Sequence, residues 1–179
     1  MKPSQLILRW CVVSFVLSIP ALLVGDEASF TRQEDVIYGR KYGVALTMDV
    51  FTPKENANGA AVVFAVSGGW FSAHEAINPG FINEFLNRGY TVFAVVHGSQ
   101  PKFTIPEVLS DMNRSLRYIR HHAKDYHIDP DRIGITGASA GGHLSLMQGT
   151  AGDKGNAAAK DPVDRESSRV QAVACFFPP

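Results

Sequence analysis

The sequence predicts an α/β fold: a three-layer sandwich with a mainly parallel sheet between two layers of helices. Apolar, β-rich runs alternate with amphipathic helical stretches along residues 35–177, which is typical of a parallel sheet covered on both faces. Two of the apolar runs end in glycine-rich turns, at 67–70 and 137–142. Apolar residues make up 45% of the 179 residues and charged residues 19%, a composition that supplies one packed core and argues against disorder.

Residues 1–25 are typical of a secretory signal peptide. Lys2 and Arg9 form a basic start, an apolar stretch follows, and Gly25 is a small residue at the expected cleavage point. The apolar stretch is about 15 residues long, shorter than the roughly 20 that a membrane-spanning helix needs. We therefore favour a cleaved signal over an uncleaved anchor. We expect a secreted or periplasmic protein without stable membrane insertion, whose folded domain spans 26–179.

Cysteine content and charge exclude several classes of protein. Cys11 lies inside the predicted signal, so Cys175 is the only cysteine of the mature chain and no internal disulfide is expected. We expect Cys175 to be an inert core residue, because it lies in an apolar run. The formal net charge is zero, so nothing indicates a nucleic-acid partner. The six histidines show no metal-ligand spacing, and we expect neither a metal nor another cofactor.

The secondary structure follows from the periodicity. Residues 36–38 and 46–51 predict two strands around a glycine-containing turn, and the polar–apolar alternation of the second run favours a half-exposed hairpin at a sheet edge. Residues 151–169 predict a long, mobile surface loop, because they are rich in Gly, Ala and Asp. The remaining elements are strands over 60–66, 90–96, 132–136 and 170–177, and helices over 79–88, over 105–126 and directly after Ser139.

The stretch 137–141 reads Gly-Ala-Ser-Ala-Gly and lies between an apolar strand and a helical pattern. This G-x-S-x-G arrangement is informative only in such a strand–turn–helix context. The tight turn holds Ser139 in a sparsely populated backbone conformation and exposes its hydroxyl, while glycines on both sides avoid collisions between side chains. The N-terminal amides of the following helix favour negative charge nearby. We therefore predict that Ser139 is a nucleophile and not part of a merely crowded turn.

A second motif, Ser67-Gly68-Gly69-Trp70, follows the strand 60–66. Glycines at the carboxyl end of a strand let backbone N–H groups approach a ligand closely, as an oxyanion hole requires. By itself the pattern also fits an ordinary turn. In a parallel sheet, however, the carboxyl ends of neighbouring strands meet at one edge, so we expect this corner to lie beside Ser139.

These two motifs, together with the turn at 129–133 that leads into the second, resemble the α/β-hydrolase superfamily. Within it, the sequence is similar to the esterase/lipase branch that includes hormone-sensitive lipase-like and bacterial feruloyl-esterase-like proteins. The resemblance covers roughly residues 35–179. It implies an α/β-hydrolase fold and a small-molecule ester substrate.

The resemblance implies roles for five residues. Ser139 matches the family's nucleophile, and the amide of Ala140 matches one oxyanion donor. The corner formed by Gly68, Gly69 and Trp70 matches the positions that supply the other donors. The implied chemistry is acyl transfer, in which the serine attacks an ester carbonyl, the amides hold the oxyanion, and water later releases the acid.

Two features depart from the family pattern. The family usually has a histidine where Ser67 stands. Its triad continues after the nucleophile with Asp or Glu and then His, whereas the one histidine after Ser139 is His143. His143 is expected on the same helix as the nucleophile, and a base reaches the hydroxyl better from a separate loop. The aspartates before the last strand lie too early to match the family's acid: Asp153, Asp161 and Asp164.

We therefore interpret 26–179 as the N-terminal portion of a secreted serine hydrolase acting on carboxylic esters, with the triad Asp and His absent from this chain. Two alternatives stay open. One is a catalytically inactive hydrolase-like fragment or binding protein. The other is a serine peptidase of the prolyl oligopeptidase type, which also carries G-x-S-x-G-G, although no upstream repeat of the propeller kind is present.

Overall fold

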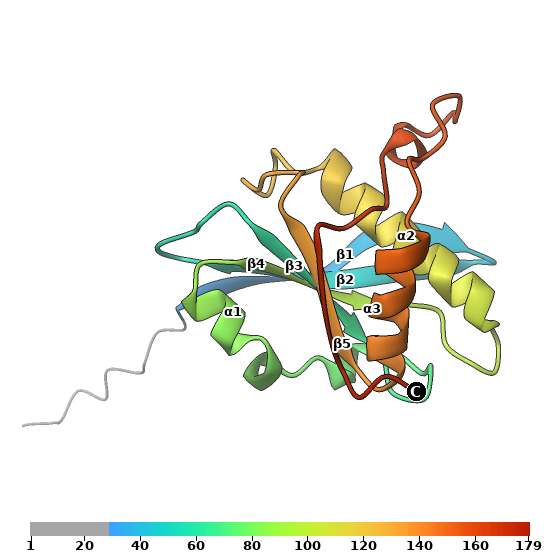
Figure 1. Ribbon diagram of the computed structural model, residues 1–179, viewed down its shortest axis with the longest axis horizontal. Coiled ribbons are helices and arrows are strands. Elements are labelled where there is room, and N and C mark those ends of the chain that lie inside the picture. Colours follow the sequence, from blue (N-terminus) through green and yellow to red (C-terminus); the bar gives the residue numbers. More distant parts are fainter. Residues whose placement is uncertain (1–28) are drawn as a thin grey trace, which may run out of the picture.

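The computed structural model describes residues 29–179, which form a six-stranded sheet between two layers of helices (Figure 1). The strands are β1 (Phe30–Lys41), β2 (Val44–Pro53), β3 (Ala61–Val66), β4 (Thr91–Val96), β5 (Ile133–Ala138) and β6 (Ala172–Phe176). Their order across the sheet is β1-β2-β4-β3-β5-β6. The last four of these are mutually parallel, whereas β2 is antiparallel to both of its neighbours. The predicted α/β class and the alternation of strands and helices are confirmed.

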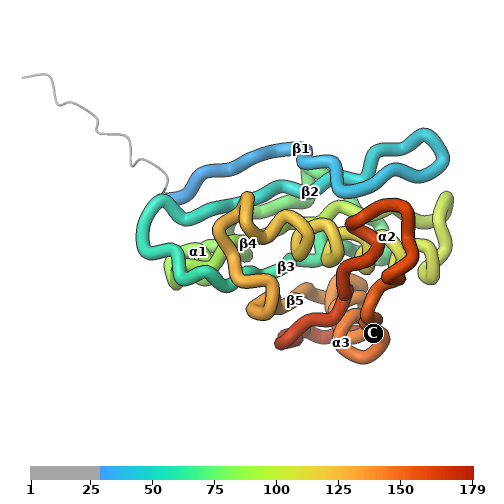
Figure 2. The backbone as a smooth tube through the Cα atoms, turned by 90° about the horizontal axis from the view of Figure 1, so that it is seen from above, coloured from blue at the N-terminus to red at the C-terminus, as the bar shows by residue number. Residues whose placement is uncertain are grey.

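Helices cover both faces of the sheet (Figures 1 and 2). On one face, α2 (Ile105–His121) and α3 (Ala140–Ala151) pack against a core to which α2 contributes residues three or four apart: Val108, Met112, Leu116 and Ile119. This spacing places the apolar stripe of α2 on the sheet. On the other face, α1 (Asn83–Asn87) packs through Leu86 on a second cluster. Short 3-10 turns complete the fold: η1 (His74–Ala76), η2 (Pro79–Phe81) and η3 (Pro162–Arg165).

Three predicted boundaries are wrong. The helix expected over 79–88 is a 3-10 turn followed by five helical residues, because the side chain of Asn78 caps the Gly80 amide and the chain reverses at Gly89, which has a φ of 81°. The helix expected over 105–126 ends at His121, and the N–H of Ile128 then donates to the carbonyl of Ala123 (2.9 Å) as the chain turns back toward the sheet. The last strand is shorter than 170–177.

The hairpin lies at an edge of the sheet, as predicted, but its second strand is more buried than the expected half-exposure. β2 lies between β1 and β4, so both of its sides are paired and only β1 forms the edge. Asp49 of β2 is fully buried and accepts hydrogen bonds from Arg32 and from the Asp35 amide. A buried carboxylate requires such partners, and the alternation that suggested solvent exposure arises from this internal ion pair.

The segment 152–169 is anchored, which corrects the expectation of a mobile loop. Arg114, Arg117 and Arg120 lie three residues apart on α2, on the side that faces the segment. Arg117 pairs with Asp153 at 2.5 Å and donates to the carbonyl of Glu166 at 3.1 Å. The other two arginines bind Asp161, Asp164 and the carbonyls of Ser167 and Arg169. The segment is therefore held along its length by one helix.

β6 forms the second edge of the sheet, and its side chains are largely exposed. Phe176 is 57% exposed and the neighbouring Phe177 is 76% exposed. Cys175 is half-buried and unbonded, so it is not the core residue that the sequence suggested. In the part of the chain that the structure describes, the helices are all too short or too polar to cross a bilayer.

We predict that Arg117→Ala releases the 152–169 segment while leaving the fold intact. The pair that it removes is partly exposed, so the free energy of unfolding should change by only about 0–1 kcal/mol. Tryptic cleavage at Lys154 in the folded protein should rise several-fold. Arg88→Ala, which removes the exposed pair with Glu84 on α1, is the matched control and should leave the cleavage rate unchanged.

The Arg117–Asp153 ion pair, which ties the segment to α2, also has a defined pH dependence. Hydrogen bonding from Arg117 holds the pKa of Asp153 below its ordinary value, so the tie is fully present above the usual aspartate pKa of about 3.9 and is lost as the pH falls through the depressed value. The difference in amide-exchange protection between wild type and Arg117→Ala should therefore be constant near neutrality and shrink below about pH 4. A difference that persists in acid would contradict this assignment.

Candidate active site

The predicted turn around Ser139 is present. β5 ends at Ala138, α3 begins at Ala140, and Ser139 between them has φ 50° and ψ −123°. A non-glycine residue in this region is strained by about 1–3 kcal/mol and persists only where its surroundings hold it. The Ser139 N–H donates to the carbonyl of Phe176 on β6 (3.0 Å), and its own carbonyl accepts from the His143 N–H (3.0 Å). The Ser139 side chain is exposed, and no hydrogen bond joins its hydroxyl to another of the residues 29–179.

The glycines beside Ser139 are required sterically. A Cβ at Gly137 would lie 2.5 Å from the carbonyl oxygen of Gly141. A Cβ at Gly141 would lie 2.5 Å from the carbonyl oxygen of Ala65. Both obstacles are backbone atoms that cannot swing aside. The absence of side chains therefore brings the start of α3 directly against the end of β3.

The 67–70 corner is a tight turn closed by paired hydrogen bonds between Gly68 and Phe71, each 2.9 Å. Gly69 and Trp70 at its tip have φ values of 57° and 58°. The Gly68 N–H is used within the turn, so Gly68 does not supply the free donor that the family resemblance implied. The amides of Gly69 and Trp70 make no backbone hydrogen bond within the described chain, and they remain the candidates from this corner.

Two contacts place this corner beside the serine turn. The carbonyl oxygen of Ser67 lies 3.6 Å from the Cβ position of Gly141. The indole Nε1 of Trp70 donates to Nδ1 of His143 (3.4 Å), one helical turn after Ser139. The structure therefore brings together the two motifs, which lie about 70 residues apart in the sequence. The Ser67 hydroxyl, where the family usually has histidine, is buried without a hydrogen-bond partner among residues 29–179.

A second loop, which follows β4, supports the corner, and the sequence reasoning gave it no role. The Gln100 N–H donates to the carbonyl of Trp70 (3.1 Å). The Ser72 amide donates to the Ser99 hydroxyl (2.8 Å), and that hydroxyl donates back to the carbonyl of Ser72 (2.9 Å). The position of Ser99 in the sequence could have indicated this role, because Ser99 follows the strand adjacent to β3 and so lies at the same edge of the sheet. Burial lowers the pKa of the neighbouring His97, so its ring is neutral at pH 7.

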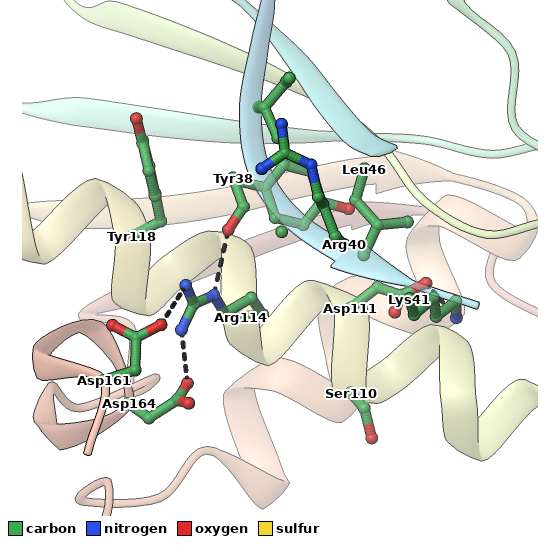
Figure 3. Close-up of a pocket in the computed structure, with 12 residues that line it drawn as sticks. Tyr38, Arg40, Lys41, Leu46, Ser110, Asp111, Arg114, Tyr118, Asp161 and Asp164 are labelled. Carbon is green, nitrogen blue, oxygen red and sulfur yellow. Dashed lines mark hydrogen bonds and ion pairs between the residues drawn. The ribbon is translucent and has the colours of Figure 1, made fainter. Parts of the chain in front are cut away.

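A large cleft lies elsewhere, between the β1–β2 hairpin, α2 and the 152–169 segment (Figure 3). Its volume is about 580 Å³, and Ser139 does not line it. Several charges in its wall pair with one another: Lys41 with Asp111 at 2.6 Å, and Arg114 with Asp161 at 2.7 Å. These ion pairs join α2 to the hairpin and to the 152–169 segment across the cleft.

One group of side chains in the described part has spacing suited to a metal ion: Glu34, Asp49 and His74. The Arg32 guanidinium already occupies this position. Its Nη2 lies 2.5 Å from an Asp49 oxygen and 3.3 Å from Nε2 of His74. A resident cationic side chain satisfies the buried carboxylate, so the group fits an ion-pair network rather than a metal centre.

The mainly parallel sheet, the strained serine between β5 and α3, and the glycine corner after β3 together define an α/β-hydrolase. A family profile described as BD-FAE matches residues 48–179. This match covers well over half of the sequence, and the chain belongs to the BD-FAE family.

Several individual relatives are named as ester hydrolases. The chain is 30% identical over 153 residues to a Mycobacterium tuberculosis protein named "Probable carboxylic ester hydrolase LipM", covering 83% of this chain and 35% of the relative. Among solved structures, an acetyl ester-xyloside bifunctional hydrolase from Caldicellulosiruptor lactoaceticus superposes with a TM-score of 0.70 at 25% identity. Thermogutta terrifontis esterase 2, phosphonylated by cyclosarin, superposes with 0.68 at 25%.

The matches to the two solved structures cover 80% and 81% of this chain, respectively, and 56% of each solved chain. The chain therefore spans about a third of the length of the curated relative and about half of each solved structure.

We predict that Gly141→Ala is far more destabilising than Gly134→Ala, although both positions belong to the β5–α3 unit. The Gly141 Cβ meets backbone at 2.5 Å, whereas the Gly134 Cβ has its nearest neighbour at an ordinary 3.5 Å. Overpacking of this kind costs about 1–3 kcal/mol, while the control should shift the free energy of unfolding by about 1 kcal/mol or less. Urea unfolding followed by circular dichroism measures both, and equal effects would contradict the steric account.

Proposed function

We propose that this chain carries the nucleophile-bearing part of a serine esterase acting on carboxylic esters. The observation that carries the proposal is the backbone of Ser139, held at φ 50° and ψ −123° with an exposed side chain at the start of α3. Backbone strain of this kind clusters at active sites, where the surrounding structure holds it in place. Membership of the BD-FAE family and the ester hydrolases among the relatives support the reaction class.

The proposed chemistry is acyl transfer to Ser139. Its oxygen attacks the ester carbonyl carbon, a general base accepts its proton, and the alcohol leaves with a proton as the acyl-serine forms. The amides of Ala140, Gly69 and Trp70 are the proposed donors to the oxyanion. Water then attacks the acyl-serine, releasing the acid and restoring the hydroxyl.

The residues 29–179 place no base at the Ser139 hydroxyl. The nearby His143 uses Nδ1 to accept from Trp70. The aspartates at 153, 161 and 164 are bound to arginines of α2. From these residues alone we expect acylation without efficient turnover, since oxyanion donors and binding retain about 10³–10⁴-fold catalysis over water when a triad is incomplete. The relatives named as ester hydrolases favour this reading over a peptidase or a binding protein.

The test is covalent labelling. Paraoxon and p-nitrophenyl acetate each release nitrophenolate when they transfer their phosphoryl or acyl group to a nucleophile, and intact-protein mass spectrometry detects the adduct. We expect one adduct per chain, located at residue 139 by peptide mapping. Ser139→Ala should abolish it, because alanine has no nucleophile.

Ser110→Ala is the matched control, since Ser110 is an exposed serine on α2 whose hydroxyl donates to the carbonyl of Pro106. It should label as wild type does. Absence of labelling in the wild-type chain, or labelling that survives Ser139→Ala, would overturn the proposed function.

We also propose that the protein is exported. The signal peptide predicted over 1–25 lies outside the described residues, so its basic start and short apolar stretch are the support. N-terminal sequencing of protein recovered from a secreting host should begin at Asp26. Recovery of Met1 in the cell-associated fraction alone would contradict cleavage.

A further inference from the structure

His143 has a specific place in the fold that neither the nucleophile nor the oxyanion donors account for. It lies one turn after Ser139 on α3, and its backbone N–H donates to the carbonyl of Ser139 (3.0 Å). Its imidazole leaves the helix toward the 67–70 corner and meets the indole of Trp70 edge to face, with ring centroids 5.7 Å apart and planes at 78°. One residue therefore contacts both halves of the candidate site.

The hydrogen bond between the two rings fixes what His143 can do. Trp70 Nε1 is a donor only, so Nδ1 of His143 acts as the acceptor at 3.4 Å. In the neutral imidazole the proton is then on Nε2. The Nδ1 lone pair is already used, which argues against His143 taking the Ser139 proton through that atom.

Trp70 needs this support because its backbone is strained. Its φ of 58° is costly for a bulky residue. The Gln100 N–H holds its carbonyl (3.1 Å), the core cluster packs on its ring, and His143 accepts from its indole. Of these three contacts, the last is the hydrogen bond that joins Trp70 to the helix carrying Ser139.

We propose that His143 is a positioning residue that holds the Trp70 corner in register with Ser139. It aims the amides of Gly69 and Trp70 at the oxyanion through its Nδ1 and plays no part in proton transfer. This inference rests on the proposed esterase function and adds a residue to it.

Two substitutions separate hydrogen bonding from packing. His143→Phe keeps an aromatic ring beside Trp70 but removes the acceptor, while His143→Gln restores an acceptor oxygen on a flexible side chain. We expect His143→Phe to slow acylation of Ser139 by p-nitrophenyl acetate about tenfold or more, less than the ~10²–10³-fold loss typical of deleting a whole oxyanion donor. His143→Gln should recover much of the rate. His122→Phe, at the residue that follows α2, is the matched control.

A second readout does not depend on activity. The sequence contains two tryptophans, so a Trp10→Phe background leaves Trp70 as the only indole N–H in a proton–nitrogen NMR spectrum. Acceptance by His143 should move this signal downfield. His143→Phe should move it upfield, whereas His143→Gln and His122→Phe should leave it near its wild-type position.

The two readouts distinguish the failures. An indole signal unmoved by His143→Phe shows that the contact is absent and overturns the inference. A signal that moves while the acylation rate of His143→Phe equals that of wild type also overturns it, leaving Ser139 as nucleophile. A His143→Gln rate as low as that of His143→Phe assigns the imidazole a role beyond accepting a hydrogen bond and overturns it as well. Failure of the wild-type chain to label overturns the esterase function itself, with the NMR contact intact.

Discussion

The structure depends on one close approach of backbone to backbone, where the start of α3 meets the end of β3. Gly141 lies so near the carbonyl of Ala65 that any side chain would collide with it, and Gly137 meets Gly141 in the same way. This contact sets the angle at which the chain leaves β5 and thereby imposes the strained conformation of Ser139. The two sequence motifs become one site because their backbones touch.

Hydrogen bonds from small polar side chains then fix the loops at this sheet edge. Ser72 and Ser99 bind each other's loops, and Gln100 holds the strained Trp70. Loops built in this way keep their amides oriented without a ligand, which is the condition for oxyanion stabilisation without reorganisation. Polar hydrogen bonds therefore order the carboxyl edge of the sheet, whereas apolar clusters around Phe93 and Phe51 pack its two faces.

The features that the sequence predicted are those fixed by local chemistry. Strand–helix alternation, the Gly-x-Ser-x-Gly turn and the glycine corner all depend on residues close together in the chain. The features that it missed depend on distant partners. The arginines of α2 resemble an ordinary solvated face until the 152–169 segment packs on them, and Asp49 resembles an exposed residue until Arg32 reaches it. Likewise, the use of the Gly68 amide within its own turn follows from hydrogen-bond geometry that glycine content alone cannot give.

The hydrogen bond from the Ser139 amide to the carbonyl of Phe176 connects the outer strand to the backbone of Ser139. Among residues 29–179, no strand pairs with the outer side of β6, and the rings of Phe176 and Phe177 are exposed. A polypeptide hydrogen-bonded along that side would be separated from the Ser139 backbone by this one strand. The Phe176 carbonyl thus links the conformation of the Ser139 turn to a strand outside β5 and α3, the two elements that form the turn.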